Sequence, residues 1–166
     1  MIRRLARWRV PMGFAAAAVA FWFARPTASS LVSGAAIAIP GELVRVWAAG
    51  HLTRWREVTR SGPYRFMRHP LYVGSSLMAI GFAIAAARWI VAALVAVYVI
   101  VTFTAAMRFE ARELGEQFGA DYAAYREGRA APVDRPFSFA RVVSNREYRA
   151  AAGLVIAFGL LWLKTR

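Results

Sequence analysis

The chain lacks cysteine altogether and contains only two histidines, His51 and His69. Without cysteine there can be no disulfide bond, no thiolate metal site and no cysteine nucleophile. Two histidines alone make a weak set of metal ligands, so we expect no metal. No serine lies in the glycine-flanked turn that serves serine hydrolases. The sequence therefore gives no support to metalloprotease or serine hydrolase chemistry.

Acidic residues are also scarce. Nine Asp and Glu residues stand against 22 Lys and Arg residues, which gives a formal net charge of +13. This balance could serve nucleic-acid binding, but no basic stretch belongs to a recognisable nucleic-acid module, so we expect no nucleic-acid partner. The basic residues instead flank apolar runs, as they do beside membrane helices, where anionic headgroups supply the counter-charge. This pattern predicts membrane lipids as partners.

Apolar sequence is what the chain has in abundance. Of its 166 residues, 59% are hydrophobic, and the mean hydropathy is +0.40. A membrane helix needs about 20 mainly apolar residues, so the length allows four or five spans and excludes a large soluble domain. We predict an all-α integral membrane protein in which residues 1–166 form a single membrane domain. Its transmembrane helices, about five in number, are expected at 10–24, 31–50, 71–87, 89–107 and 150–163.

The expected spans differ in how closely they match an uninterrupted membrane helix of full length. The second run is interrupted at Pro40, and the last run is short enough to be re-entrant or interfacial instead of spanning. The basic, apolar N-terminus also resembles a signal peptide, although the apolar runs that follow favour a first membrane helix. Only Arg88 separates the third run from the fourth. We therefore expect those two helices to form an antiparallel hairpin.

Arginine is distributed unevenly among the segments that connect the apolar runs. The N-terminus, residues 51–70 and residues 108–149 are strongly basic, whereas the remaining turns hold only Arg25 and Arg88. Basic segments belong in the cytoplasm. We therefore predict that the N-terminus and both polar segments are cytoplasmic. Heavy use of Ala and Arg suggests a GC-rich prokaryotic genome, which makes the inner (cytoplasmic) membrane the expected location.

The most informative stretch runs from Gly62 to Gly74, where polar residues come directly before an apolar run. Pro70 suits the first position of a helix, because its missing N–H group costs nothing there. His69 then lies at the helix entry, beside Arg68. A helix N-terminus is a natural seat for a carboxylate, so this stretch predicts a binding site. The alternative is that His69 and Arg68 only contact lipid headgroups.

A second polar stretch follows the hairpin, on a helix that we expect to continue beyond the membrane as far as Gly119. A short helix after it carries Tyr122 and Tyr125 on one face. A solvated amphipathic extension with internal ion pairs would explain the charges of this stretch equally well. The hairpin, however, places Glu110 near the level of His69, which favours one polar site built from both stretches.

Two ionisable residues, Glu42 and Arg45, lie inside the second apolar run. Charges in such a position are costly enough to be functional by default. They either pair with each other near the end of a helix kinked at Pro40, which we favour, or line a ligand cavity.

These motifs, in their order and spacing, resemble the isoprenylcysteine carboxyl methyltransferase family, which belongs with the phospholipid methyltransferases. The resemblance covers about residues 41–132. It implies an integral membrane methyltransferase that uses S-adenosylmethionine without a Rossmann domain, with a methyltransferase core at 51–132 and a small lipophilic acceptor. The motifs that carry it are Gly62-Pro63-Tyr64-Arg65, Arg68-His69-Pro70, Tyr72, Gly74, Glu110, Leu114, Phe118-Gly119, Tyr122 and Tyr125.

The resemblance also assigns site residues. It implies Glu110 and Arg108 as candidate catalytic residues. Two positions depart from the family pattern: Ala111 stands where a second glutamate is usual, and Ala106 stands where an arginine handles the prenylcysteine substrate. These differences bear on the acceptor and leave methyl transfer intact. The implied cofactor contacts are Arg56, Glu57, Val58, Thr59, Tyr64, His69, Pro70, Leu71, Tyr72 and Glu110.

Methyl transfer requires alignment and exclusion of water more than acid–base help. A carboxylate acceptor needs no base, whereas an amine or a thiol would need deprotonation, for which Glu110 and His69 are the candidates. Two other functions stay open. One is an NADPH-dependent membrane reductase of the sterol-reductase type, whose chain is ordinarily much longer. The other is a non-catalytic lipid-binding membrane scaffold.

Overall fold

The computed structural model of the protein describes residue 13 and residues 15–166. All regular secondary structure in this part of the chain is helical, which confirms the all-α prediction. Residues 15–23 are also helical and precede the labelled elements. These elements are α2 (Ala28–His51), the 3-10 turn η1 (Gly62–Arg65), α3 (Pro70–Ala85), α4 (Trp89–Arg126), α5 (Phe139–Ser144) and α6 (Tyr148–Leu163).

Two of the described helices, α2 with 24 residues and α4 with 38, are long and apolar enough to cross a membrane. Helices α3 and α6 are apolar but have 16 residues each, or about 24 Å of helix. The first predicted span, 10–24, begins outside the described residues. The N-terminal arginines lie wholly outside them. Apolar side chains are exposed along the outer faces of the helices, as on a lipid-facing surface, and include Val32, Leu43, Ile100 and Val155.

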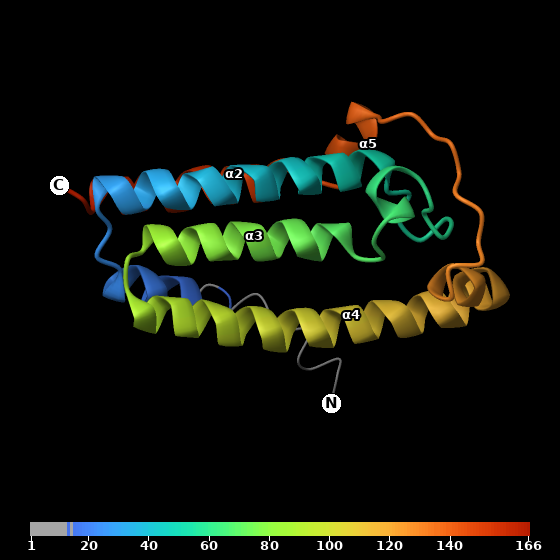
Figure 1. Ribbon diagram of the computed structural model, residues 1–166, viewed down its shortest axis with the longest axis horizontal. Coiled ribbons are helices and arrows are strands. Elements are labelled where there is room, and N and C mark those ends of the chain that lie inside the picture. The colour runs from blue at the N-terminus through green and yellow to red at the C-terminus, as the bar shows by residue number, and fades with distance from the viewer. Residues whose placement is uncertain (1–12, 14) are drawn as a thin grey trace.

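The last apolar segment runs the length of the bundle beside α2 (Figure 1). At its start, Glu147 contacts Arg45 near the end of α2. At its end, the Lys164 ammonium donates to the carbonyls of Phe21 and Trp22, just before α2 begins. Helix α6 is therefore antiparallel to α2 and does not lie across one end of the bundle.

Helices α2 and α3 approach each other closely through glycines. A Cβ atom added to Gly74 would lie 2.5 Å from the carbonyl oxygen of Gly41, and one added to Gly81 would lie 2.5 Å from that of Gly34. Small residues at such contacts let helix backbones meet, which is the usual way for helices to associate in membranes. Helix α2 continues through Pro40, so the proline that interrupts the apolar run lies inside one helix.

The predicted hairpin of α3 and α4 is present (Figure 1). Ala87 takes a left-handed conformation with φ of 52°, and Arg88 is the residue before the first turn of α4. At the far end of the hairpin, His69 and Pro70 take the expected places at the start of α3. Gly119, with φ of 45°, breaks α4 and turns its last residues aside, as predicted.

The buried apolar core lies at the hairpin-turn end of the bundle. Its residues come from the ends of four helical segments: Ala20, Ala24, Ala85, Ala86, Val91 and Leu161. The opposite end gathers residues 52–69, the last turns of α4 and the segment leading into α5 (Figure 1). Because these are the polar segments, the tight packing is separated from the polar end by the length of α3.

Candidate active site

The polar end of the bundle holds a groove of about 550 Å³, part of which is open to solvent. One wall is the irregular segment 52–61, which we call the loop. The other walls are the start of α3 and the outer half of α4. The side chains that line the groove are Leu52, Thr53, Arg54, Trp55, Glu57, Val58, Thr59, Tyr64, Arg68, His69, Glu110, Leu114, Tyr122 and Tyr125.

His69 and Glu110 meet across this groove, so the two polar stretches do form one site. The Nδ1 atom of His69 lies 3.7 Å from Oε2 of Glu110, and both side chains are partly exposed, at 27% and 34%. The hairpin explains the contact, because it returns α4 to the level at which α3 begins. Arg108, two residues before Glu110, is exposed on α4 and lines neither this groove nor the larger cavity beside it.

Tyrosines form the aromatic side of the groove. Tyr64 and Tyr122 are buried, at 8% and 6% exposure, and the Tyr125 hydroxyl donates to the carbonyl of Tyr64 at 2.9 Å. The break at Gly119 brings the last helical turns of α4 to this position. Burial, with a smaller effect from the negative charge of Glu110, raises the pKa of the Tyr64 phenol. Tyr64 therefore stays protonated at neutral pH and can donate a hydrogen bond.

Of the four loop residues that were predicted to contact the cofactor, 56–59, three lie in the groove. Glu57, Val58 and Thr59 line the groove, and the backbone N–H of Thr53 donates to Oγ1 of Thr59 at 3.3 Å. Arg56 instead lines a separate cavity, which also borders Glu57 and Val58. Residues 52–55 also line the groove but were not predicted to do so. They lie in an irregular segment, where no helical repeat in the sequence indicates which side chains face inward.

The side chains in the first turn of α3 lie in two different environments. Pro70 is fully buried, while Leu71 and Tyr72 face a second, larger cavity of about 1400 Å³. This cavity also lies against Tyr98, Thr102, Phe103 and Ala106 of α4. It shares Leu52, Arg54 and Glu110 with the groove, so the two spaces meet at these three residues.

The larger cavity has a charged wall. The Arg45 Nε atom lies 2.6 Å from Oε1 of Glu147, and the Arg45 guanidinium also donates to the hydroxyl of Ser75. The predicted pairing of Glu42 with Arg45 is present at 3.8 Å, but Glu147 is the closer partner, and Arg45 does line a cavity. Both carboxylate oxygens of Glu42 are buried without a hydrogen-bond partner in the structure.

Glu147 and its neighbour in the cavity wall, Asn145, were not predicted. The available signal was that Glu147 is the only acidic residue after Asp134 and directly precedes an apolar run. Among the described residues, no group of three or more His, Asp or Glu side chains is placed to hold a metal ion.

The fold and the site together define a helical membrane protein with a polar groove at one end of its bundle. The sequence model of the phospholipid methyltransferase family matches residues 8–121. The chain therefore belongs to that family, which confirms the resemblance and makes it a membrane methyltransferase. No curated protein matches the chain, and no solved structure does.

Proposed function

We propose that the protein transfers a methyl group from S-adenosylmethionine to an amphiphilic acceptor. In this proposal the cofactor binds in the groove and the acceptor binds in the larger cavity. The observation that carries it is that the two spaces meet at Leu52, Arg54 and Glu110. Two ligands bound in adjoining spaces can bring their reacting atoms together at the shared wall, which is what a direct transfer requires.

The side chains of the groove fit the chemistry of this cofactor. The carboxylate of Glu110 has the charge that a sulfonium attracts. Arg68, which lines only the groove, can bind the carboxylate of the amino-acid end. Trp55 and Tyr122 offer faces on which an adenine ring can stack.

When bound, S-adenosylmethionine supplies a methyl group, and the carbon–sulfur bonding electrons return to sulfur as an acceptor lone pair takes the carbon. The protein orients the acceptor and keeps water out, which suits a groove enclosed by buried tyrosines. A carboxylate acceptor needs no further help. An amine or a thiol needs a proton acceptor, and the groups that can serve are Glu110 at the shared wall and His69, which lies beside it in the groove.

Positive charge for the acceptor head group comes from Arg45 and Arg54 in this proposal. Ala106, the position at which prenylcysteine enzymes have an arginine, lines the larger cavity but offers no charge. Arg108 is exposed outside it, and its catalytic role stays a prediction. An arginine pair on other segments thus replaces the missing one, which favours an acceptor other than prenylcysteine.

Isothermal titration calorimetry on the purified protein in detergent tests the cofactor assignment. We expect S-adenosylmethionine and S-adenosylhomocysteine to bind and NADPH not to bind. His69→Ala should weaken S-adenosylmethionine binding without unfolding the protein. Binding of NADPH alone would indicate a reductase, and binding of none of the three would leave a lipid-binding scaffold as the better description.

The acceptor assignment predicts a dependence on tail length, because the larger cavity lies among lipid-facing helices. Each methylene group buried there should contribute about 0.8 kcal/mol, or roughly fourfold in kcat/KM. Acceptors with one head group and increasing chain length, assayed by radiolabelled methyl transfer below the micellar limit, measure this. If short water-soluble acceptors react with equal kcat/KM, entry from the bilayer is wrong.

A further inference from the structure

Residues 133–147, which we call the strap, cross the polar end of the bundle. They lie outside the family match, which ends at residue 121. At the start of the strap, Arg65 of η1 donates to the carbonyl of Val133 at 2.9 Å and pairs with Asp134 at 3.0 Å. The strap is therefore attached to the segment that leads into α3.

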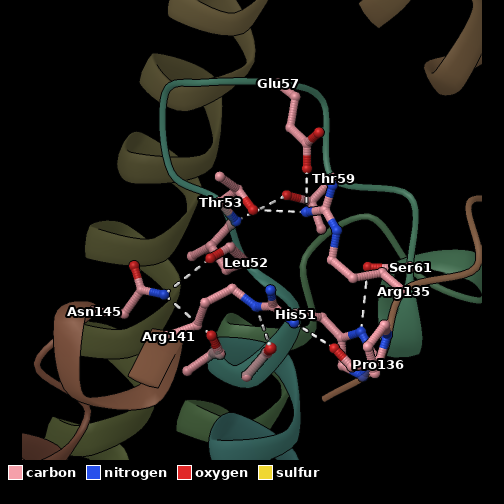
Figure 2. A network of polar contacts seen from close by, with 12 residues as sticks. His51, Leu52, Thr53, Glu57, Thr59, Ser61, Arg135, Pro136, Arg141 and Asn145 are labelled. Carbon is pink, nitrogen blue, oxygen red and sulfur yellow. Dashed lines mark hydrogen bonds and ion pairs between the residues drawn. The ribbon is translucent and has the colours of Figure 1, made fainter. Parts of the chain in front are cut away.

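The strap also closes the C-terminal end of α2 (Figure 2). Arg141 Nε donates to the carbonyl of Gly50 at 2.6 Å, and the Asn145 amide donates to the carbonyls of Ala49 and Leu52, each at 3.0 Å. The last carbonyls of a helix have no partner within the helix. Because the strap supplies those partners, its path over the end of α2 is fixed by several independent bonds.

Between these two attachments, Arg135 reaches the loop (Figure 2). Its Nη1 atom donates to Oγ1 of Thr53 at 2.6 Å and forms an ion pair with the carboxylate of Glu57. Thr53 and Glu57 both line the groove, whereas Arg135 does not. One guanidinium therefore holds two points of the groove wall from behind.

The loop is tied to the rest of the fold by side-chain hydrogen bonds: besides those of Arg135, the Gln117 amide of α4 donates to the carbonyl of Trp55 at 2.8 Å. It contains no helix, and Trp55 within it takes a left-handed conformation with φ of 61°. The groove is also narrow, because only about 50 Å³ of it can hold the centre of a water molecule. A ligand the size of a nucleoside needs more room than this, so the bonds that hold the loop bear on how such a ligand is bound.

We infer that Arg135 is a positioning residue that holds the loop 52–61 against the bound cofactor. The inference rests on the proposed function, because it takes S-adenosylmethionine as the groove ligand. The planar guanidinium can bind Thr53 and Glu57 at once, which the single ammonium of a lysine does less well. The hydrogen bond from Arg135 also lowers the pKa of Glu57, so this partner is ionised at neutral pH.

The test compares Arg135→Ala with Arg135→Lys and with a matched control, Arg129→Ala. Arg129 also forms an ion pair, with Glu127, but lines neither the groove nor the larger cavity. Calorimetry should show S-adenosylmethionine binding weakened about tenfold in Arg135→Ala, less in Arg135→Lys, and unchanged in the control. The rate constant kcat at saturating cofactor should change little. Hydrogen exchange should become faster in residues 53–59 alone.

Three results separate the possible failures. If the wild-type protein binds no S-adenosylmethionine, the proposed function is wrong. If the wild type binds it and Arg135→Ala binds equally well, the positioning role is wrong and the proposed function stands. Faster exchange throughout α2 and α3 would show that Arg135 only stabilises the fold, which also overturns the inference. Should Arg135→Ala fail to fold, Arg135→Lys carries the same comparison.

Discussion

Glu110 is the charged side chain that faces both His69 and the shared wall of the two cavities. Changing it to glutamine keeps the size of the side chain and removes its charge. If the groove binds a sulfonium, this change removes an opposite charge near the ligand. The affinity for S-adenosylmethionine should therefore fall, while the neutral product S-adenosylhomocysteine should lose less.

The size of the loss follows from the exposure of the carboxylate. A hydrogen bond or close contact with a charged group contributes about 1.5–3 kcal/mol when it is buried. The Glu110 side chain is 34% exposed, and solvent weakens exposed charge interactions towards 1 kcal/mol or less. We therefore expect about 1.5 kcal/mol, or roughly a tenfold rise in Kd for Glu110→Gln.

Calorimetry in detergent measures this change, with Glu113→Gln as the control. Glu113 lies on the same helix and loses the same charge, but it lines neither cavity. We expect the control to bind as the wild type does. Equal affinity in wild type and Glu110→Gln, or an equal loss in both variants, would refute the assignment of the groove to a cationic cofactor.

Three further predictions concern packing, topology and pH. Gly81→Ala should lower stability by about 1–3 kcal/mol, because its Cβ would meet backbone of α2; Gly159→Ala, with open space around its Cβ, should change the thermal midpoint much less. Single cysteines at Arg54 and Gly128 should resist an impermeant thiol reagent in intact cells, and labelling of either would contradict a cytoplasmic groove. The lowered pKa of Glu57 means that its ion pair with Arg135 persists above the ordinary pKa of about 4.3 and is lost only as the pH falls through the lowered value. The ratio of the S-adenosylmethionine affinities of the wild type and Arg135→Ala should therefore stay constant between about pH 5 and 8 in calorimetry, and a midpoint of this ratio inside that range would contradict it.

The part of the site built by the hairpin could be predicted because its signals are local. Pro70 marks the start of one helix, and Arg88 marks the turn. The apolar runs on either side of the turn, 71–87 and 89–107, are similar in length, so His69 and Glu110 come to one level. Gly119 is a local signal of the same kind, because glycine readily takes the left-handed conformation that ends a helix. Each of these features depends on a few neighbouring residues, which is the information that a single sequence carries.

The strap could not be predicted in this way, because its contacts join residues that are far apart in the chain. Arg135 is 82 positions from Thr53, and Arg45 is 102 positions from Glu147. No periodic pattern connects such residues, and irregular segments have no fixed inward face. At Pro40 local propensity disfavours a helix, yet α2 runs through this residue and packs against α3 and α6.

The family match ends at residue 121, and residues on both sides of this point line the two spaces of the proposed site. The groove residues from Leu52 to Leu114 lie inside the family match, so the family shares the segment that would hold the cofactor. Glu147 and Asn145 lie beyond it, yet they complete the wall of the larger cavity. A buried ion pair such as Arg45 with Glu147 is costly to break by removing one partner, since a charge is then left unpaired away from water. An acceptor head group that enters this wall must therefore satisfy both charges or displace neither.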